Sequence, residues 1–166
     1  MLNSNSRNCC ATIVTESHIV YAVALFRSIR HFCPHFEFFA FVTDAASHDL
    51  PEEINEFQIL SASILEGTSY FQSIRSKYSG NYEDEYRWSL KPVVLEYLLE
   101  RAFDYCFMLD SDLFFFENPC EVFSCLRDNA LLLSPHWRSI DPHSDPKNFE
   151  LLRTSGHYNA GFVGAS

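Results

Sequence analysis

In the stretch CFMLDSDLFFFENP, residues 106–119, an apolar run ends abruptly in two carboxylates. Asp110 and Asp112 are separated only by Ser111, and they follow the apolar letters YCFML at 105–109. A short apolar run of this kind is typical of a strand buried in a parallel sheet. The two aspartates then either cap a turn at the end of this strand or hold a cation.

The chain on both sides of this stretch alternates between strand-like and helix-like patterns. CCATIV (9–14) and FEFFAFV (36–42) predict strands, and SHIVYAVALFRSIRHF (17–32) between them has apolar residues at helical spacing. Further strands are expected at 57–60, 105–109, 130–134 and 158–166, and further helices at 86–103, 120–129 and 147–155. This alternation predicts one α/β domain over 1–166, a mostly parallel sheet covered by helices on both faces.

Polar residues follow three of the predicted strands. Thr15–Glu16 and Thr43–Asp44 occupy the same position after the first two strands, and Asp110 to Asp112 follow the strand at 105–109. Ligands of open parallel sheets bind at the carboxyl ends of the strands. We therefore expect all three groups at one edge of the sheet.

Composition excludes several classes of protein. The chain has 12 basic and 22 acidic residues, a formal charge of −10, which disfavours nucleic acid as a partner. It has only 5 Gly and contains neither a dinucleotide-binding nor a P-loop glycine motif. If the protein binds phosphates, we expect a metal ion to assist.

The apolar runs of the sequence indicate where in the cell the protein resides. The first residues contain no apolar signal segment, and no apolar run is long enough for a membrane span, so we expect a cytoplasmic protein with no transmembrane segment.

The 6 cysteines form no metal-binding or disulfide pattern, which predicts reduced thiols, mostly buried. His31, Cys33 and His35 have the spacing of metal ligands, but they lie around a helix end at Pro34, and we do not favour a zinc site there.

Five segments together resemble a known enzyme family. They are CATIVTESHIVYAVALFRSIRHFCP, RWSLKPVVLEYLL, YCFMLDSDLFFFENP, LLLSPH and GHYNAGFVGAS, and they cover almost the whole chain. In order and spacing they resemble bacterial sugar transferases of the GT-A fold, similar to the family 8 group with glycogenin and lipopolysaccharide galactosyltransferases. The resemblance implies a glycosyltransferase that uses a nucleotide-diphosphate sugar, UDP-sugar being the expected donor, with Mn²⁺ or Mg²⁺.

The resemblance also implies roles for individual residues. Asp110 and Asp112 would bind the metal and, with Ser111, the nucleotide, and Thr15 would lie beside the nucleoside. Arg87 and Lys91 would approach the sugar diphosphate, and Asn159 would lie near the donor sugar or the reaction centre as the catalytic candidate.

Each of these residues also has a simpler interpretation. Arg87 and Lys91, four apart on one helix, either meet a diphosphate together or form a solvated basic face. Asn159 could instead bond its own backbone. His136 and Trp137 follow the strand at 130–134 and either touch an acceptor sugar, which remains unidentified, or belong to an ordinary loop.

Members of this family continue beyond the NAGF strand, whereas this sequence stops at Ser166. We therefore expect an incomplete N-terminal half with background transfer activity, and possible self-association through an exposed, apolar sheet edge. Without the family 8 likeness, Glu16, Asp141 or Asp145 would be candidate general bases. Two other functions stay open: a non-catalytic remnant that serves as an interaction module, and, less favoured, a sugar nucleotidyltransferase.

Overall fold

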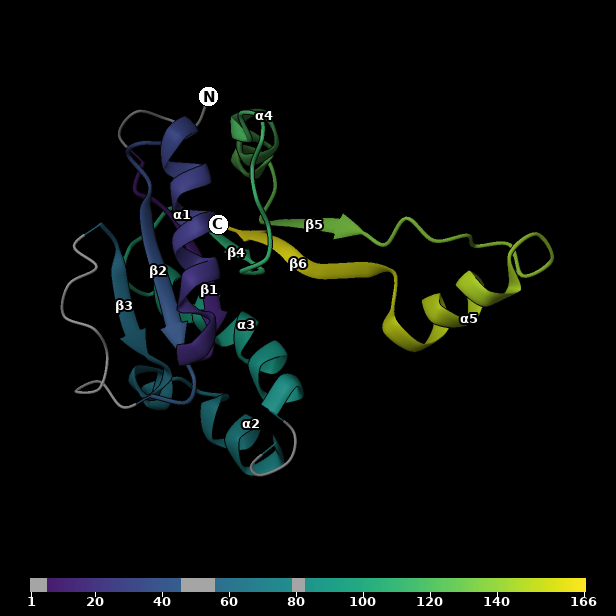
Figure 1. Ribbon diagram of the computed structural model, residues 1–166, viewed down its shortest axis with the longest axis horizontal. Helices are drawn as coiled ribbons and strands as arrows, with labels where there is room; N and C mark the ends of the chain where they lie inside the picture. Colours follow the sequence, from purple (N-terminus) through teal and green to yellow (C-terminus); the bar gives the residue numbers. More distant parts are fainter. Residues whose placement is uncertain (1–5, 46–55, 79–82) are drawn as a thin grey trace.

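The computed structural model describes residues 6–45, 56–78 and 83–166. Within them, six strands form one sheet in the order β3-β2-β1-β4-β6-β5 (Figure 1). The strands are β1 (Asn8–Val14), β2 (Glu37–Val42), β3 (Gln58–Ser61), β4 (Tyr105–Leu109), β5 (Leu131–Pro135) and β6 (Tyr158–Ala165). The first four strands are parallel to one another, and β6 runs antiparallel to β4 and β5. The predicted mostly parallel sheet is confirmed.

Helices cover both faces of this sheet, as predicted. The α-helices are α1 (Ile19–Phe32), α2 (Phe71–Tyr78), α3 (Glu83–Leu99), α4 (Cys120–Phe123) and α5 (Pro146–Ser155); the 3₁₀ helices are η1 (Glu16–His18), η2 (Ala62–Gly67) and η3 (Ser124–Arg127). Cys10 and Phe38 face a core shared with α1 and α4, while Ala11 and Phe39 face a core shared with α2 and α3. Side chains alternate along a strand, so neighbouring residues enter opposite cores. In the described part of the chain, no helix has the combined length and apolar character that spanning a bilayer requires.

Helix α3 contains Pro92 in its interior. The sequence left open whether this proline kinks the helix or marks its first turn, and the helix begins at Glu83, well before it. Proline has no backbone N–H, so the carbonyl of Trp88 loses its usual helical donor at this point. The helix persists because Leu90, Val93 and other apolar residues on either side of the proline are buried against the sheet.

The edges of the sheet differ from the expectation. We expected the last strand to leave an apolar edge unpaired, and this is wrong, because β6 pairs with β4 on one side and with β5 on the other. Among the described strands, β3 and β5 are the edges. The expected basis for self-association is therefore absent from β6.

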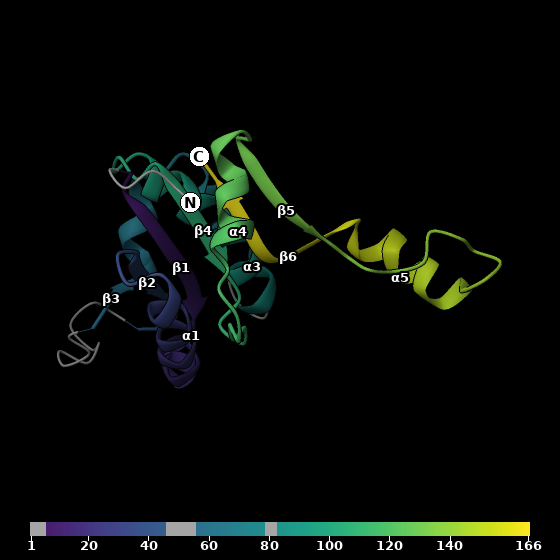
Figure 2. The ribbon, with the colours of Figure 1, turned by 90° about the horizontal axis from the view of Figure 1, so that it is seen from above.

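Strands β5 and β6 extend beyond the sheet as a protruding arm, residues 134–160. Their pairing shifts register after Leu133 and continues through Ser134 with Asn159 and Pro135 with Tyr158. Figures 1 and 2 show the arm standing away from the sheet, with α5 at its end. Because this segment leaves the body of the protein, Trp137 is 93% exposed.

All six cysteines are free thiols. Cys9, Cys10, Cys33 and Cys106 are buried, Cys120 is half-buried and Cys125 is exposed. The prediction of reduced, mostly buried thiols is confirmed.

Candidate functional site

The carboxyl ends of β1, β2 and β4 meet at one edge of the sheet, as the sequence predicted. The backbone N–H of Glu16, after β1, donates to Asp44 Oδ1 after β2 at 2.7 Å, and Asp110 directly follows β4. The parallel register brings these strand ends together. Polar groups from three strands that are distant in the sequence thus share one edge.

A cavity of about 400 Å³ lies at this edge, between the beginning of α1 and the middle of α3. It is lined by Ile13, His18, Tyr21, Arg87, Trp88, Lys91, Asp110, Ser111 and Asp112. Five of the nine lining residues are ones that the sequence had proposed for binding the sugar nucleotide, namely Arg87, Lys91, Asp110, Ser111 and Asp112. The structure therefore brings the acidic pair and both basic residues of α3 to one cavity.

Asp110 is held in place by its backbone and by one carboxylate oxygen. Its N–H donates to the carbonyl of Gly161 at 2.8 Å, and its Oδ1 accepts a hydrogen bond from Lys91 Nζ at 2.5 Å. Its Oδ2 lies above Gly161, where a Cβ atom would be 2.8 Å from that oxygen. Glycine is therefore needed at position 161 for the close approach of the carboxylate.

Lys91 is buried despite its charge, with only 7% of the residue exposed. Its ammonium group donates to Asp110 Oδ1 and, at 2.9 Å, to the carbonyl of Ala160. A buried charge costs free energy unless it is paired and hydrogen-bonded. Lys91 meets this condition and joins α3 to the ends of β4 and β6, so it is not part of a solvated basic face.

Arg87 lies one helical turn before Lys91 and is partly buried. Its guanidinium forms an ion pair with Asp84, and the exposed fraction of its side chain is 26%. Its Nε is buried and has no hydrogen-bond partner within the described residues. A buried donor without a partner is unfavourable, and an anionic ligand in the cavity would satisfy it.

Four of the residues that line the cavity were not predicted from the sequence, namely Ile13 and three residues with rings, His18, Tyr21 and Trp88. The His18 ring is stacked against Tyr21 with centroids 5.6 Å apart, and Trp88 on α3 is 59% exposed. The signal for Trp88 was its position three residues before Lys91, which places both on one helix face. Ile13 and the His18–Tyr21 pair carry no such signal, since their approach to α3 depends on tertiary packing.

Two predicted residues, Thr15 and Asn159, do not line the cavity. Thr15 Oγ1 lies 2.6 Å from His18 Nδ1, and His18 is one of the residues that line the cavity. Asn159 Oδ1 accepts a hydrogen bond from the N–H of Gly161 at 2.7 Å. This contact agrees with the simpler interpretation of Asn159, in which its side chain bonds the local backbone. A role for either residue in binding or catalysis stays a prediction.

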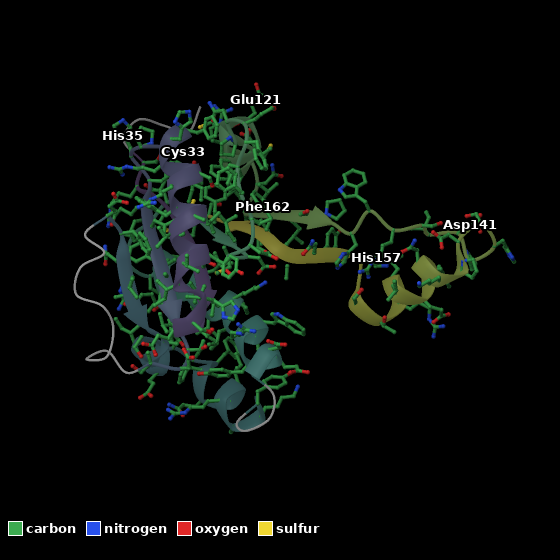
Figure 3. The ribbon with its side chains drawn as sticks, viewed as in Figure 1. Cys33, His35, Glu121, Asp141, His157 and Phe162 are labelled. Carbon is green, nitrogen blue, oxygen red and sulfur yellow. The ribbon has the colours of Figure 1, made fainter. Side chains whose placement is uncertain are left out.

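The remaining predicted residues lie on the arm or at the sheet edge. The N–H of His136 donates to the carbonyl of His157 at 2.8 Å, and neither His136 nor Trp137 lines the cavity. Asp141, on the arm in Figure 3, has a lowered pKa because its carboxylate accepts the N–H of His143. The pKa of Asp145 is lowered by hydrogen bonds from Asn148, so both carboxylates stabilise local turns.

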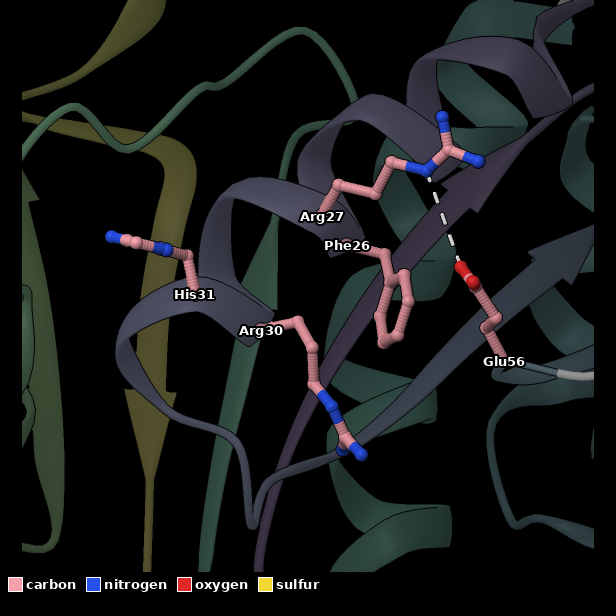
Figure 4. Close-up of a pocket in the computed structure, with 5 residues that line it drawn as sticks. All are labelled: Phe26, Arg27, Arg30, His31 and Glu56. Carbon is pink, nitrogen blue, oxygen red and sulfur yellow. Dashed lines mark ion pairs between the residues drawn. The ribbon is translucent and has the colours of Figure 1, made fainter.

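Other hollows of the described surface are chemically different. One of about 560 Å³ is lined by Phe26, Arg27, Arg30, His31 and Glu56. In Figure 4 its basic side chains point in different directions, and Arg27 forms an ion pair with Glu56 at 4.0 Å. Another, between α2 and α3, is mainly apolar. Within residues 6–45, 56–78 and 83–166, no group of three or more His, Cys, Asp or Glu is placed to hold a metal ion.

The sheet and its helices have the GT-A glycosyltransferase fold, as the similarity to solved structures of this fold shows. The galactosyltransferase LgtC, in complex with donor and acceptor sugar analogues, has a TM-score of 0.58 and 12% identity, covering 95% of this chain and 57% of that one. Mouse xyloside xylosyltransferase 1, in its apo form, has a TM-score of 0.56 and 13% identity, covering 96% and 66%. Core-mannan synthase A of Aspergillus fumigatus, in a manganese and GDP form, has a TM-score of 0.57 and 8% identity, covering 99% and 60%.

Two curated proteins of Bacillus subtilis are similar in sequence. The uncharacterised YfnD is 26% identical over 157 residues, covering 93% of this chain and 48% of the relative, and the uncharacterised YfnF is 24% identical over 157 residues, covering 92% and 50%. The chain thus spans about half the length of the curated relatives it matches. No family model matches the sequence.

Proposed function

We propose that this chain forms the donor-binding part of a metal-dependent glycosyltransferase that uses a nucleotide-diphosphate sugar. The observation that carries this proposal is the cavity at the carboxyl edge, where Asp110, Asp112, Arg87 and Lys91 converge. The GT-A fold supports the same reaction class. The donor is proposed to be a UDP-sugar on the strength of the family 8 resemblance.

Charge balance explains why a cation would be needed. Lys91 is paired with Asp110, and Arg87 is paired with Asp84, so both basic groups already have carboxylate partners. Asp112 adds one more negative charge to the cavity. A diphosphate entering this site would meet net negative charge, and a divalent cation would remove the repulsion.

The donor set fits Mn²⁺ or Mg²⁺. Such ions bind through one or two carboxylates and complete their coordination with water and substrate phosphate oxygens. Asp112 and the Oδ2 atom of Asp110 are the carboxylate groups available, because Lys91 already binds Oδ1. When bound, the ion would supply Lewis-acid stabilisation of the diphosphate leaving group.

The rings around the cavity suit the other parts of a sugar nucleotide. Tyr21 is 50% exposed and Trp88 is 59% exposed, so both present apolar faces to the open space. Aromatic faces pack against bases and against the C–H groups of sugars. The chain residues would thus bind and orient the donor, and burial of Lys91 would keep Asp110 in one position.

Calorimetry with a series of nucleotides tests this proposal. With Mn²⁺ present, UDP and UDP-sugars should bind, and uridine should bind weakly because it lacks the diphosphate. Arg87→Ala should reduce UDP affinity about ten- to a hundredfold, the cost of a charge-assisted hydrogen bond. The matched control is Arg153→Ala, which removes a similar ion pair with Glu150 on α5, far from the cavity. Absence of binding by every nucleoside diphosphate would contradict the proposal.

A further inference from the structure

Two pairs of thiols are in contact, and they differ in their surroundings. Cys9 Sγ and Cys106 Sγ are 3.5 Å apart, and Cys33 Sγ and Cys120 Sγ are 3.4 Å apart. Cys9 and Cys106 are register partners in β1 and β4, and both are fully buried. Cys33 is 3% exposed, whereas Cys120 is half-buried.

The second pair is brought together by the packing of α4 on the end of α1. The N–H of Cys33 donates to the carbonyl of Ile29 at 2.8 Å and ends α1, while Cys120 is the first residue of α4. The ring of Phe36 is stacked on that of Phe123, with centroids 5.6 Å apart, just beyond the two cysteines. Figure 3 shows Cys33 at this end of α1 and Glu121, the neighbour of Cys120, on α4.

We propose that Cys33 and Cys120 are a modification site, a dithiol that hydroperoxides convert to an intramolecular disulfide. The half-buried Cys120 thiol reacts first: its sulfur takes one peroxide oxygen to form a sulfenic acid, and the O–O bond breaks to release water from hydrogen peroxide. The Cys33 sulfur then forms the S–S bond, and the sulfenic oxygen leaves as a second water. Each sulfur is oxidised by one electron, and the peroxide is reduced by two.

Geometry favours this pair over the buried one. A disulfide bond is about 2.0 Å long, so the sulfurs in either pair need to approach by about 1.5 Å. The fully buried Cys9 and Cys106 are closed to an oxidant, but Cys120 is not. The ends of α1 and α4 can also shift more readily than two adjacent strands in the middle of the sheet.

Burial slows disulfide formation in this pair. Burial, together with the hydrogen bond to Cys120, raises the pKa of Cys33 well above the usual value for a thiol. A thiol must lose its proton to attack, so the second step is slow near neutral pH and accelerates as the pH rises. The disulfide would therefore form under oxidative stress or at alkaline pH rather than spontaneously.

The disulfide bond would attach the segment that follows the acidic pair to the end of α1. Residues 110–119 connect β4 to Cys120, and in the middle of this segment the N–H of Phe115 donates to Ser28 Oγ on α1 at 3.2 Å. A disulfide would add a covalent attachment to α1 at the far end of the segment. It would also close a loop of 87 residues, which restricts the unfolded chain.

The test is oxidation of the whole chain with hydrogen peroxide at neutral and alkaline pH. Free thiols are then blocked, and peptides are mapped by mass spectrometry without reduction. We expect Cys33–Cys120 as the main linked pair, with loss of two hydrogen atoms, faster formation at the higher pH and a rise in Tm of roughly 5–15 °C that dithiothreitol reverses.

Matched variants make the result decisive. Cys120→Ser should abolish the linked peptide and the rise in Tm, whereas Cys125→Ser, at an exposed cysteine on the neighbouring η3, should leave both unchanged. Linkage of Cys9 to Cys106, intermolecular products through Cys125 as the main species, or no disulfide at all would each overturn the proposal.

Discussion

At the scale of single residues, Asp110 decides the geometry of the candidate site. Its Oδ1 is bound by Lys91, and its Oδ2 lies where a side chain at position 161 would be. The sequence predicted that Asp110 and Asp112 belong to a ligand site, because two carboxylates after an apolar strand are a local pattern. It did not predict the ion pair between Asp110 and Lys91, because these residues are 19 positions apart and meet only through packing of α3 on β4.

Gly161→Ala tests the close approach of Asp110. A Cβ atom at this position would be 2.8 Å from Asp110 Oδ2 and 3.0 Å from Asn159 Oδ1, so the carboxylate must move. We expect a loss of about 1–3 kcal/mol in the free energy of unfolding and weaker Mn²⁺-dependent nucleotide binding. Gly67→Ala is the control, because a Cβ there meets nothing within 4 Å. Equal stability and affinity in the two variants, measured by urea unfolding and calorimetry, would show that position 161 is unconstrained.

Lys91→Met tests whether this lysine positions the carboxylate. The variant keeps the apolar stem but removes the partner of Asp110, whose side chain is 42% exposed and therefore partly solvated. We expect a loss of about 1–2 kcal/mol in stability, between the values typical of exposed and of buried ion pairs, because water screens Asp110. Arg75→Met removes the exposed pair with Glu66 and should change stability by less than about 0.5 kcal/mol. A Lys91→Met protein as stable as Arg75→Met would refute the positioning role.

For the secondary-structure elements, the presence of each strand and helix follows from local sequence patterns, but where the elements end and how they are arranged in space does not. The strand at 105–109 and the helix of α1 have apolar periodicities that tertiary contacts reinforce. Pro92 is different: local chemistry favours a helix start or a kink, yet burial of the residues around it keeps α3 continuous. The arm carries a helix, α5, that the sequence did predict, but nothing local indicated that it would stand away from the sheet.

Helix α5 should lose its N-terminal turn in acid. Asp145 caps it by accepting the N–H of Asn148 at 3.2 Å, and hydrogen bonds from Asn148 lower the pKa of Asp145. A lowered folded-state pKa stabilises the helix above the unfolded value, about 3.9, and this stabilisation disappears as the pH falls through the folded value.

Hydrogen exchange at the backbone amide of Asn148 measures this effect. Protection should decrease at a pH below about 3.9, after correction for the intrinsic exchange rate. Asp145→Asn retains a capping side chain without the titration, so its protection should not change over the same interval. The same acid dependence in Asp145→Asn would show that another group is responsible.

At the scale of the whole molecule, the fold class was predictable and the arrangement of its second half was not. Alternating strands and helices fix a parallel sheet with two covered faces, and a parallel sheet fixes the edge at which ligands bind. The antiparallel insertion of β6 between β4 and β5 depends on long-range pairing, for which the sequence has no local signal. This pairing brings Gly161 against Asp110, which lines the cavity.

The central claim is that Asp110 and Asp112 bind a cation together with a nucleotide diphosphate. If so, nucleotide affinity must rise with metal, and metal affinity must rise equally with nucleotide, because coupling between two ligands is reciprocal. Asp112→Asn retains the size and the turn-capping ability of the side chain and removes only its charge. The fold should therefore survive while the coupling is lost.

The most direct measurement is a calorimetric titration of UDP into the wild-type chain and into Asp112→Asn, each with Mn²⁺ and with EDTA. We expect Mn²⁺ to increase UDP affinity at least about tenfold in the wild type, equivalent to about 1.4 kcal/mol, and to have little effect in the variant. Equal UDP binding in all four titrations, with unchanged thermal stability, would contradict the metal site and leave the acidic pair as a turn at the end of β4.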